Sequence, residues 1–154
     1  MLVALKNDYF NMAMYLFAFA GVMMGFFKKE KIKIARWQQI AEGGAKQSGR
    51  GLIPEIKPLM SFSEALRYAK ELDAAIVPYE KAEGMAKTRE IIKGLKSKKS
   101  VGIFIGPEGG FDESEIEEAM AAGAFPVTLG HRILRTETAG LTMLSVLMFE
   151  FEED

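Results

Sequence analysis

VGIFIGPEGGFDESEIEEAMAAGA, residues 101–124, is the stretch that decides the expected fold. An apolar run at 101–105 ends in the glycine-rich turn 106–110, and an acidic segment with helical character follows at once. We expect Asp112 to cap that helix, with Glu115 completing a capping box, and Gly123 to end it. The stretch therefore predicts a buried strand, a loop at its carboxyl end and a helix.

The same alternation of strand and helix runs through most of the chain. The pattern predicts further strands at 2–5, 22–27, 74–77 and 127–129, and helices at 8–20, 36–47, 63–72, 86–95 and 138–149. Ser63 is expected to cap one helix, and the sequence from Ser48 to Gly51 to end another. This order is typical of an α/β domain with a largely parallel sheet and ligand loops at the carboxyl ends of its strands.

The segment 9–27 has no charged residue, and its length is in the range of a membrane span. Gly21 divides it into a helix-length piece and a shorter piece rich in β-branched and aromatic residues. We therefore expect a buried helix followed by a buried strand, and no membrane insertion.

Composition excludes several classes of site. The chain of 154 residues has no cysteine and one histidine, so disulfides, thiolate zinc sites, a cysteine nucleophile and a multi-histidine metal cluster are excluded within one chain. We expect no metal, and a reducing, cytoplasmic setting. The formal net charge of −1 does not pull the whole chain onto nucleic acid, although a local basic face could bind it.

The glycine turn raises the question of its ligand. Glycine loops after strands often bind phosphate, but neither G-x-G-x-x-G nor a Walker-type motif is present, and Asp112, Glu113 and Glu115 occupy the positive end of the following helix. A nucleoside carrying a sulfonium cation, S-adenosylmethionine, suits a backbone-rich loop beside acidic residues better. The alternative is a tight turn that binds nothing.

A second loop, 130–137, strengthens the ligand interpretation. Arg132 and Arg135 flank an apolar pair, and Thr136, Glu137 and Thr138 are expected to open the last helix as capping residues. The loop 106–110 thus provides backbone polar groups beside acidic residues. The loop 130–137 provides arginines that could bind a polyanionic substrate. A capped surface loop with two solvated arginines is the alternative.

IGPEGGF followed by LGHRILRTETA resembles the C-terminal signature of the 16S rRNA uracil-N3 methyltransferase family (RsmE type), in the SPOUT superfamily of trefoil-knotted enzymes. RWQQIAEGGAKQSGR, 36–50, resembles an internal helix motif of the same family. The resemblance implies a SPOUT-type α/β fold over 1–154 with a C-terminal deep trefoil knot. The PUA-like RNA-binding domain with which that family normally begins is expected to be absent from 1–154. It implies a cofactor site for S-adenosylmethionine at Gly106, Glu108, Gly109, Gly110, Leu129, Gly130, Ile133, Leu134, Thr136, Thr138 and Ala139.

For the chemistry, the resemblance implies methyl transfer to N3 of a uridine in 16S rRNA or the small ribosomal subunit. Arg135 and Arg132 are the candidates to stabilise the developing imide anion, and Glu137 is a candidate proton acceptor that could equally be a helix cap. Arg50 and Arg132 are candidates to hold RNA. His131 is given no role, because a lone loop histidine is more often solvated than catalytic.

Two other functions stay open at this point: a related knotted ribose 2′-O-methyltransferase acting on another RNA, and a non-catalytic cofactor-binding or dimerisation module. A homodimer is expected in each case, because the final helix is apolar around much of its circumference.

Overall fold

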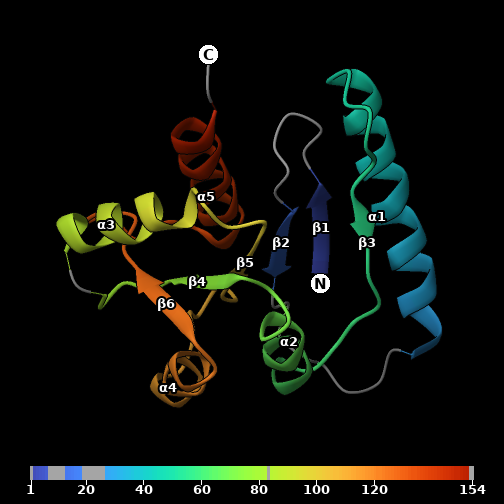
Figure 1. The fold of residues 1–154 in the computed structure, drawn as a ribbon. Helices are drawn as coiled ribbons and strands as arrows, with labels where there is room; N and C mark the ends of the chain where they lie inside the picture. The colour runs from blue at the N-terminus through green and yellow to red at the C-terminus, as the bar shows by residue number, and fades with distance from the viewer. Residues whose placement is uncertain (1, 7–12, 19–26, 83, 153–154) are drawn as a thin grey trace.

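The computed structural model describes residues 2–6, 13–18, 27–82 and 84–152. Within these ranges it contains one sheet with strand order β3-β1-β2-β5-β4-β6, packed against helices (Figure 1). The strands are β1 (Leu2–Lys6), β2 (Ala13–Ala18), β3 (Glu55–Ile56), β4 (Ala74–Pro78), β5 (Ser100–Ile105) and β6 (Ala124–Val127). The helices are α1 (Phe27–Gln47), α2 (Phe62–Ala69), α3 (Met85–Leu95), α4 (Glu113–Ala121) and α5 (Thr136–Phe151).

Four neighbouring strands, β2, β5, β4 and β6, run parallel, while β1 is antiparallel to both β2 and β3. The prediction of an α/β domain with a largely parallel sheet is confirmed. Because parallel strands end at the same edge, the loops after β4, β5 and β6 lie at one side of the sheet.

Alternating side chains along the strands divide the core between the two faces of the sheet. Ile76 and Ile103 pack in a cluster with Ile92 of α3 and with Met143 and Leu147 of α5. On the other face, Val77 and Phe104 pack with Leu66 of α2 and Ile116 of α4. Figure 1 accordingly shows α3 and α5 on one side of β4 and β6, and α2 and α4 on the other. The period-2 alternation of a strand buried on both faces produces these three layers.

The prediction of a helix at 8–20 is wrong. Residues 13–18 form β2, which lies between β1 and β5 and pairs with both. An uninterrupted apolar run cannot be assigned to a buried helix or a buried strand by periodicity, and here pairing on both sides decides for the strand. The remainder of that segment, and the predicted strand at 22–27 except Phe27, lie outside the described residues. Phe27 itself begins α1.

Within the part of the chain that the structure describes, none of the helices has both the length and the apolar character required for a membrane crossing.

Several boundaries differ from those predicted. The N-cap of α2 is Ser61 rather than Ser63, and its capping box with Glu64 is complete: Ser61 N–H donates to Glu64 Oε2 at 2.7 Å, and Glu64 N–H to Ser61 Oγ at 3.3 Å. β6 covers 124–127 instead of 127–129, because the chain enters the sheet directly after Gly123 ends α4. α1 begins nine residues before the predicted position 36.

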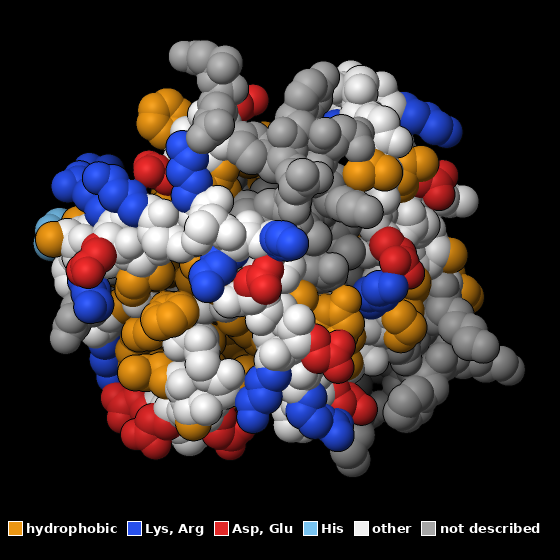
Figure 2. Space-filling view, viewed as in Figure 1, with side chains coloured by type: hydrophobic (Ala, Val, Ile, Leu, Met, Phe, Trp, Pro, Cys, Tyr) orange, Lys and Arg blue, Asp and Glu red, His pale blue; other side chains and the backbone are white. Residues whose placement is uncertain are grey.

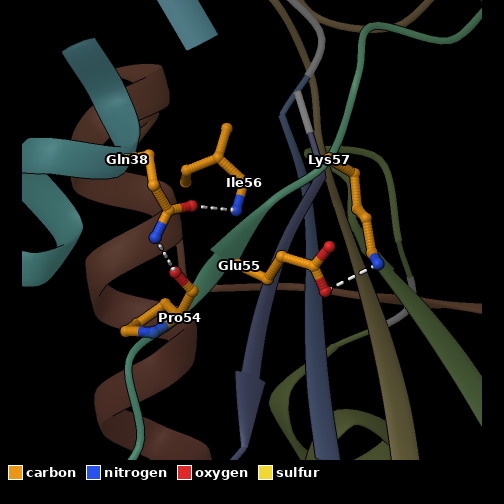
Figure 3. A network of polar contacts seen from close by, with 5 residues as sticks. All are labelled: Gln38, Pro54, Glu55, Ile56 and Lys57. Carbon is orange, nitrogen blue, oxygen red and sulfur yellow. Dashed lines mark hydrogen bonds and ion pairs between the residues drawn. The ribbon is translucent and has the colours of Figure 1, made fainter. Parts of the chain in front are cut away.

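One side chain holds α1 against the edge strand β3. Gln38 donates through Nε2 to the Pro54 carbonyl at 3.1 Å, and its Oε1 accepts the N–H of Ile56 at 2.9 Å (Figure 3). The amide thus pairs with the backbone of β3 as a neighbouring strand would. The predicted end of α1 at the Ser48 to Gly51 sequence is confirmed, because Arg50 N–H donates back to the Ala45 carbonyl at 2.9 Å.

Candidate cofactor and RNA site

A cavity of about 750 Å³ lies at the carboxyl ends of β4, β5 and β6. Its walls come from three segments, the described residues of 78–85 (all but residue 83), 106–111 and 128–136, together with Ala139 from the first turn of α5. All of the predicted cofactor residues except Thr138 line it, namely Gly106, Glu108, Gly109, Gly110, Leu129, Gly130, Ile133, Leu134, Thr136 and Ala139. The structure therefore brings together two loops that α4 and β6 separate in the sequence.

The loop after β5 is shaped by local packing. A Cβ on Gly106 would stand 3.1 Å from the ring of Phe111, so a larger residue there would displace that ring. Gly110 has a φ of +78°, which side chains disfavour. By contrast, a Cβ on Gly109 would meet no protein atom within 4 Å, although Gly109 lines the cavity. The backbone conformation at Gly110 thus favours glycine, and Gly106 packs closely against Phe111, while Gly109 faces open space in the cavity.

The acidic side chains in the first turn of α4 have hydrogen-bond partners within the chain. The predicted capping box between Asp112 and Glu115 is present, and Asp112 N–H donates to Glu115 Oε2 at 2.9 Å. Lys81, from the loop after β4, hydrogen-bonds to Glu113. This hydrogen bond, with the attraction between the charges, lowers the pKa of Glu113 and raises the pKa of Lys81. The contact between Lys81 and Glu113 therefore connects the loop after β4 to the start of α4. The negative charge at this helix end disfavours binding of a phosphate.

The loop after β6 carries the predicted catalytic side chains, but they do not all face the cavity. Arg132 is exposed and lines it, whereas Arg135, Glu137 and Thr138 are exposed and do not. The expectation that Thr136 to Thr138 cap the last helix is wrong. The N-cap of α5 is Arg135, whose carbonyl accepts the Ala139 N–H at 2.8 Å without a side-chain cap. Arg135 is consequently held by its backbone at the start of α5, with its guanidinium toward solvent.

Sequence reasoning missed a third wall. Pro78, the last residue of β4, lines the cavity together with Tyr79 and Glu80, which follow it directly, and with Ala82, Gly84, Met85, Phe111, Thr128 and His131. The signal for the first three was present: a predicted buried strand closed by Pro78, parallel to its neighbour, ends at the same edge. Glu80 adds a second carboxylate to that of Glu108.

Arg50 lies away from these arginines. It follows α1, which packs on β3 at one edge of the sheet, while the cavity lies at β5, β4 and β6 toward the other edge (Figure 1). Arg50 is half-buried and does not line the cavity. Within one chain, the structure does not bring Arg50 together with Arg132 and Arg135.

The face over β6 is apolar and hollowed. Figure 2 shows apolar side chains gathered there between α3 and α4, with basic side chains toward α3 and acidic ones toward α4. Phe125 of β6 is half exposed in this edge strand. Pro126, next to it, carries no backbone N–H, which limits further strand pairing at this edge.

Comparison with known proteins identifies the domain. Residues 15–148 match the family described as RNA methyltransferase domain. The chain belongs to that family. The match spans every wall of the cavity, from the strands to the start of α5, and the resemblance found in the two loop motifs is confirmed.

Two relatives of this methyltransferase domain share a name. The chain is 36% identical over 128 residues to Ribosomal RNA small subunit methyltransferase E of Bacillus subtilis, covering 81% of the chain and 50% of the relative. It is 37% identical over 113 residues to the protein of the same name from Mesomycoplasma hyopneumoniae, covering 73% and 47%. The chain thus spans about half the length of these relatives.

Solved structures agree with the fold. A methyltransferase from Legionella pneumophila in complex with S-adenosylmethionine superposes with a TM-score of 0.74 at 30% identity, covering 87% of this chain and 53% of the other. The Ribosomal RNA small subunit methyltransferase E of Neisseria gonorrhoeae, bound to S-adenosylmethionine, gives 0.70 at 30% identity, covering 86% and 52%.

Proposed function

We propose that this chain binds S-adenosylmethionine in the strand-end cavity and uses it to methylate N3 of a uridine in 16S rRNA. The observation that carries the proposal is the convergence of the loops 78–85, 106–111 and 128–136 on one cavity. The two similar structures that contain bound S-adenosylmethionine support it. The relatives named for the small-subunit ribosomal RNA support the choice of substrate.

The residues present fit this cofactor. The glycine loops offer backbone N–H and C=O groups that can read an adenine and a ribose, and the open space at Gly109 allows close approach. Carboxylates of Glu80 and Glu108 in the lining suit a sulfonium or an ammonium group. A triphosphate is disfavoured by the same carboxylates and by the acidic cap of α4.

In this proposal the chain's own residues position the RNA and stabilise the charge that develops on the target base. Bound S-adenosylmethionine supplies an electrophilic methyl group, so no covalent bond between enzyme and RNA is required. Arg132, in the cavity wall, and Arg135, beside it, stabilise the negative charge that develops on the uracil imide. Glu137 accepts the proton that leaves N3, and Arg50 binds a phosphate of the RNA.

The apolar outer face of α5 supports a homodimer. Met143, Leu147 and Phe151 turn into the core, but Phe149 is 86% exposed and Leu141 is 68% exposed, with Val146 and Met148 also exposed. Such a stripe on a small domain is typical of a self-association surface. We assign the second copy to this face.

The remaining features of the family follow as proposals. We assign residues 1–154 to one SPOUT methyltransferase domain, in which the loops after β5 and β6 belong to a C-terminal trefoil knot. Methylation of a ribosomal subunit would take place in the cytoplasm.

A labelling experiment tests the function. The chain is incubated with S-adenosylmethionine carrying a labelled methyl group and with small ribosomal subunits that lack the modification, and the RNA is then digested and analysed by mass spectrometry. We expect the label on N3 of a single uridine. Label on a ribose 2′-oxygen would support the related ribose methyltransferase instead. Binding of the cofactor with no transfer at saturating RNA would support a non-catalytic module.

Calorimetry provides an independent control for the choice of cofactor. We expect S-adenosylmethionine to bind while ATP and NAD do not, because both carry phosphates that the cavity does not accommodate. Comparable affinity for ATP would contradict the assignment of the cavity.

A further inference from the structure

Two buried hydroxyl side chains meet beside the cavity. Among the described residues, Thr88 and Thr128 are the buried polar ones, with exposed fractions of 2% and 8%. Thr88 lies in the second turn of α3, and Thr128 comes directly after β6. The two are separated by 40 residues in sequence, so their contact is a product of the tertiary fold.

The contact connects α3 to the backbone of the loop after β6. Thr88 Oγ1 accepts the N–H of Thr128 at 2.9 Å. Thr128 Oγ1 in turn accepts the N–H of Gly130 at 3.2 Å. Gly130 has a φ of +105°, a backbone conformation that favours glycine. The relay thus runs from α3 through Thr128 to the turn at Gly130.

The preceding residue is held as well. The N–H of Tyr79, in the loop after β4, donates to the carbonyl of Val127 at 2.9 Å. The peptide group that joins Val127 to Thr128 is therefore held on both sides: its C=O by the loop after β4 and its N–H by α3. Thr128, Leu129 and Gly130 line the cavity, whereas Thr88 does not.

We propose that Thr88 is a positioning residue for the cofactor site, whose buried hydroxyl fixes the backbone of 128–130 in the conformation that binds the ligand. The inference rests on the proposed function, because it concerns the same cavity. Thr88 acts through Thr128 and touches no ligand itself. A buried N–H without an acceptor is strongly disfavoured, so removing the hydroxyl forces the loop to seek water or another partner.

The test compares three substitutions on α3. Thr88→Val keeps the shape of the side chain but removes the acceptor, and Thr88→Ser keeps the acceptor. Ile92→Val, one turn further along the same helix, trims a buried core side chain without removing a hydrogen-bond acceptor. Calorimetry measures the Kd for S-adenosylmethionine, hydrogen exchange measures protection of the Thr128 and Gly130 amides, and thermal unfolding measures stability.

We expect Thr88→Val to raise the Kd about 10-fold and to speed exchange of both amides. Thr88→Ser should keep the wild-type Kd and the wild-type exchange of both amides. Ile92→Val should lower the Tm with an unchanged Kd. Wild-type affinity and wild-type exchange in Thr88→Val would overturn the proposal, as would an equal loss in Thr88→Ser.

Two further outcomes are distinguishable. If the unsubstituted chain binds no S-adenosylmethionine, the proposed function fails, and the exchange data alone still decide whether Thr88 fixes the loop. If Thr88→Val does not fold, Thr88→Cys replaces it, since a thiol is a weaker acceptor of similar size. An intermediate loss of affinity then supports the proposal, and wild-type affinity overturns it.

Discussion

Asp73 and Ser100 exchange hydrogen bonds across the amino ends of β4 and β5. Ser100 Oγ accepts the N–H of Asp73 at 3.0 Å, and Asp73 Oδ2 accepts the N–H of Ser100 at 3.0 Å. The same carboxylate oxygen accepts the N–H of Lys99 at 2.8 Å. These contacts continue the strand register by one residue beyond the pair Ala74 and Val101. The Asp73 carboxylate therefore stabilises the pairing of β4 and β5 at their amino ends, whereas the cavity lies at their carboxyl ends.

We predict that this carboxylate makes stability depend on pH in the acid range. The Lys99 N–H, followed by the Ser100 donors, holds the pKa of Asp73 below its ordinary value of 3.8. A group with a lowered folded pKa stabilises the fold above its unfolded pKa and loses that effect as the pH falls through the folded pKa. Asp73→Asn should therefore be less stable than the wild type at pH 7, with a difference that shrinks below about pH 4.

Urea unfolding from pH 7 to pH 2.5 measures this difference. Other carboxylates with a lowered pKa, Glu64 and Glu113, are present in both proteins and cancel in the comparison. A difference that stays constant down to pH 2.5 would assign the effect to shape instead of charge.

Gly109→Val should abolish binding of S-adenosylmethionine while the chain still folds. A Cβ at this position would meet no protein atom within 4 Å, yet the residue lines the cavity. Gly110→Val is the matched variant, because its φ of +78° makes any side chain costly to the fold. Calorimetry and thermal unfolding should show lost binding with a retained Tm for the first, and a lowered Tm for the second. Retained binding in Gly109→Val would show that the ligand does not approach this loop.

Arg135→Ala should separate binding from chemistry. The guanidinium is exposed and does not line the cavity, so the affinity for S-adenosylmethionine should be nearly unchanged. Methyl transfer at saturating RNA should fall by about 100-fold or more, the scale for losing one preorganised electrostatic contact. Arg135→Lys tests whether charge alone suffices, since lysine lacks the planar fork. A normal rate in Arg135→Ala would leave the arginine as a solvated loop residue.

Arg50→Ala should weaken RNA binding without affecting the cofactor. Arg50 follows α1 at the β3 edge of the sheet and does not line the cavity, so within one chain its removal leaves the cofactor site unchanged. If it binds a phosphate, the log–log salt dependence of RNA affinity should flatten by about one unit. Filter binding over a range of salt concentrations measures the slope. An unchanged slope with unchanged affinity would remove Arg50 from the RNA interface.

Phe149→Asp should convert a dimer to a monomer. Phe149 is 86% exposed on α5, so the substitution leaves the core of a single chain intact. A charge placed in an apolar interface opposes association. Light scattering under dilute native conditions should give dimer mass for the wild type and monomer mass for the variant. A wild type that is already monomeric would overturn the assignment of a second copy to this face.

Local signals in the sequence determined the elements around the cavity. The strand 101–105, the capping box of Asp112 and Glu115 and the helix end at Gly123 depend on neighbours a few residues away, and each is present. The two glycine-containing loops also carried a specific family pattern. These features could be predicted because their hydrogen bonds and backbone conformations are set within one turn of chain.

Only the tertiary structure decided the rest. Residues 13–18 form a strand because β1 and β5 supply partners on both sides, which no local pattern records. The wall formed by the loop after β4 and the contact between Thr88 and Thr128 depend on which strands are neighbours in the sheet. An apolar run states only that a segment is buried, whereas long-range pairing determines the conformation in which it is buried and the residues that it meets.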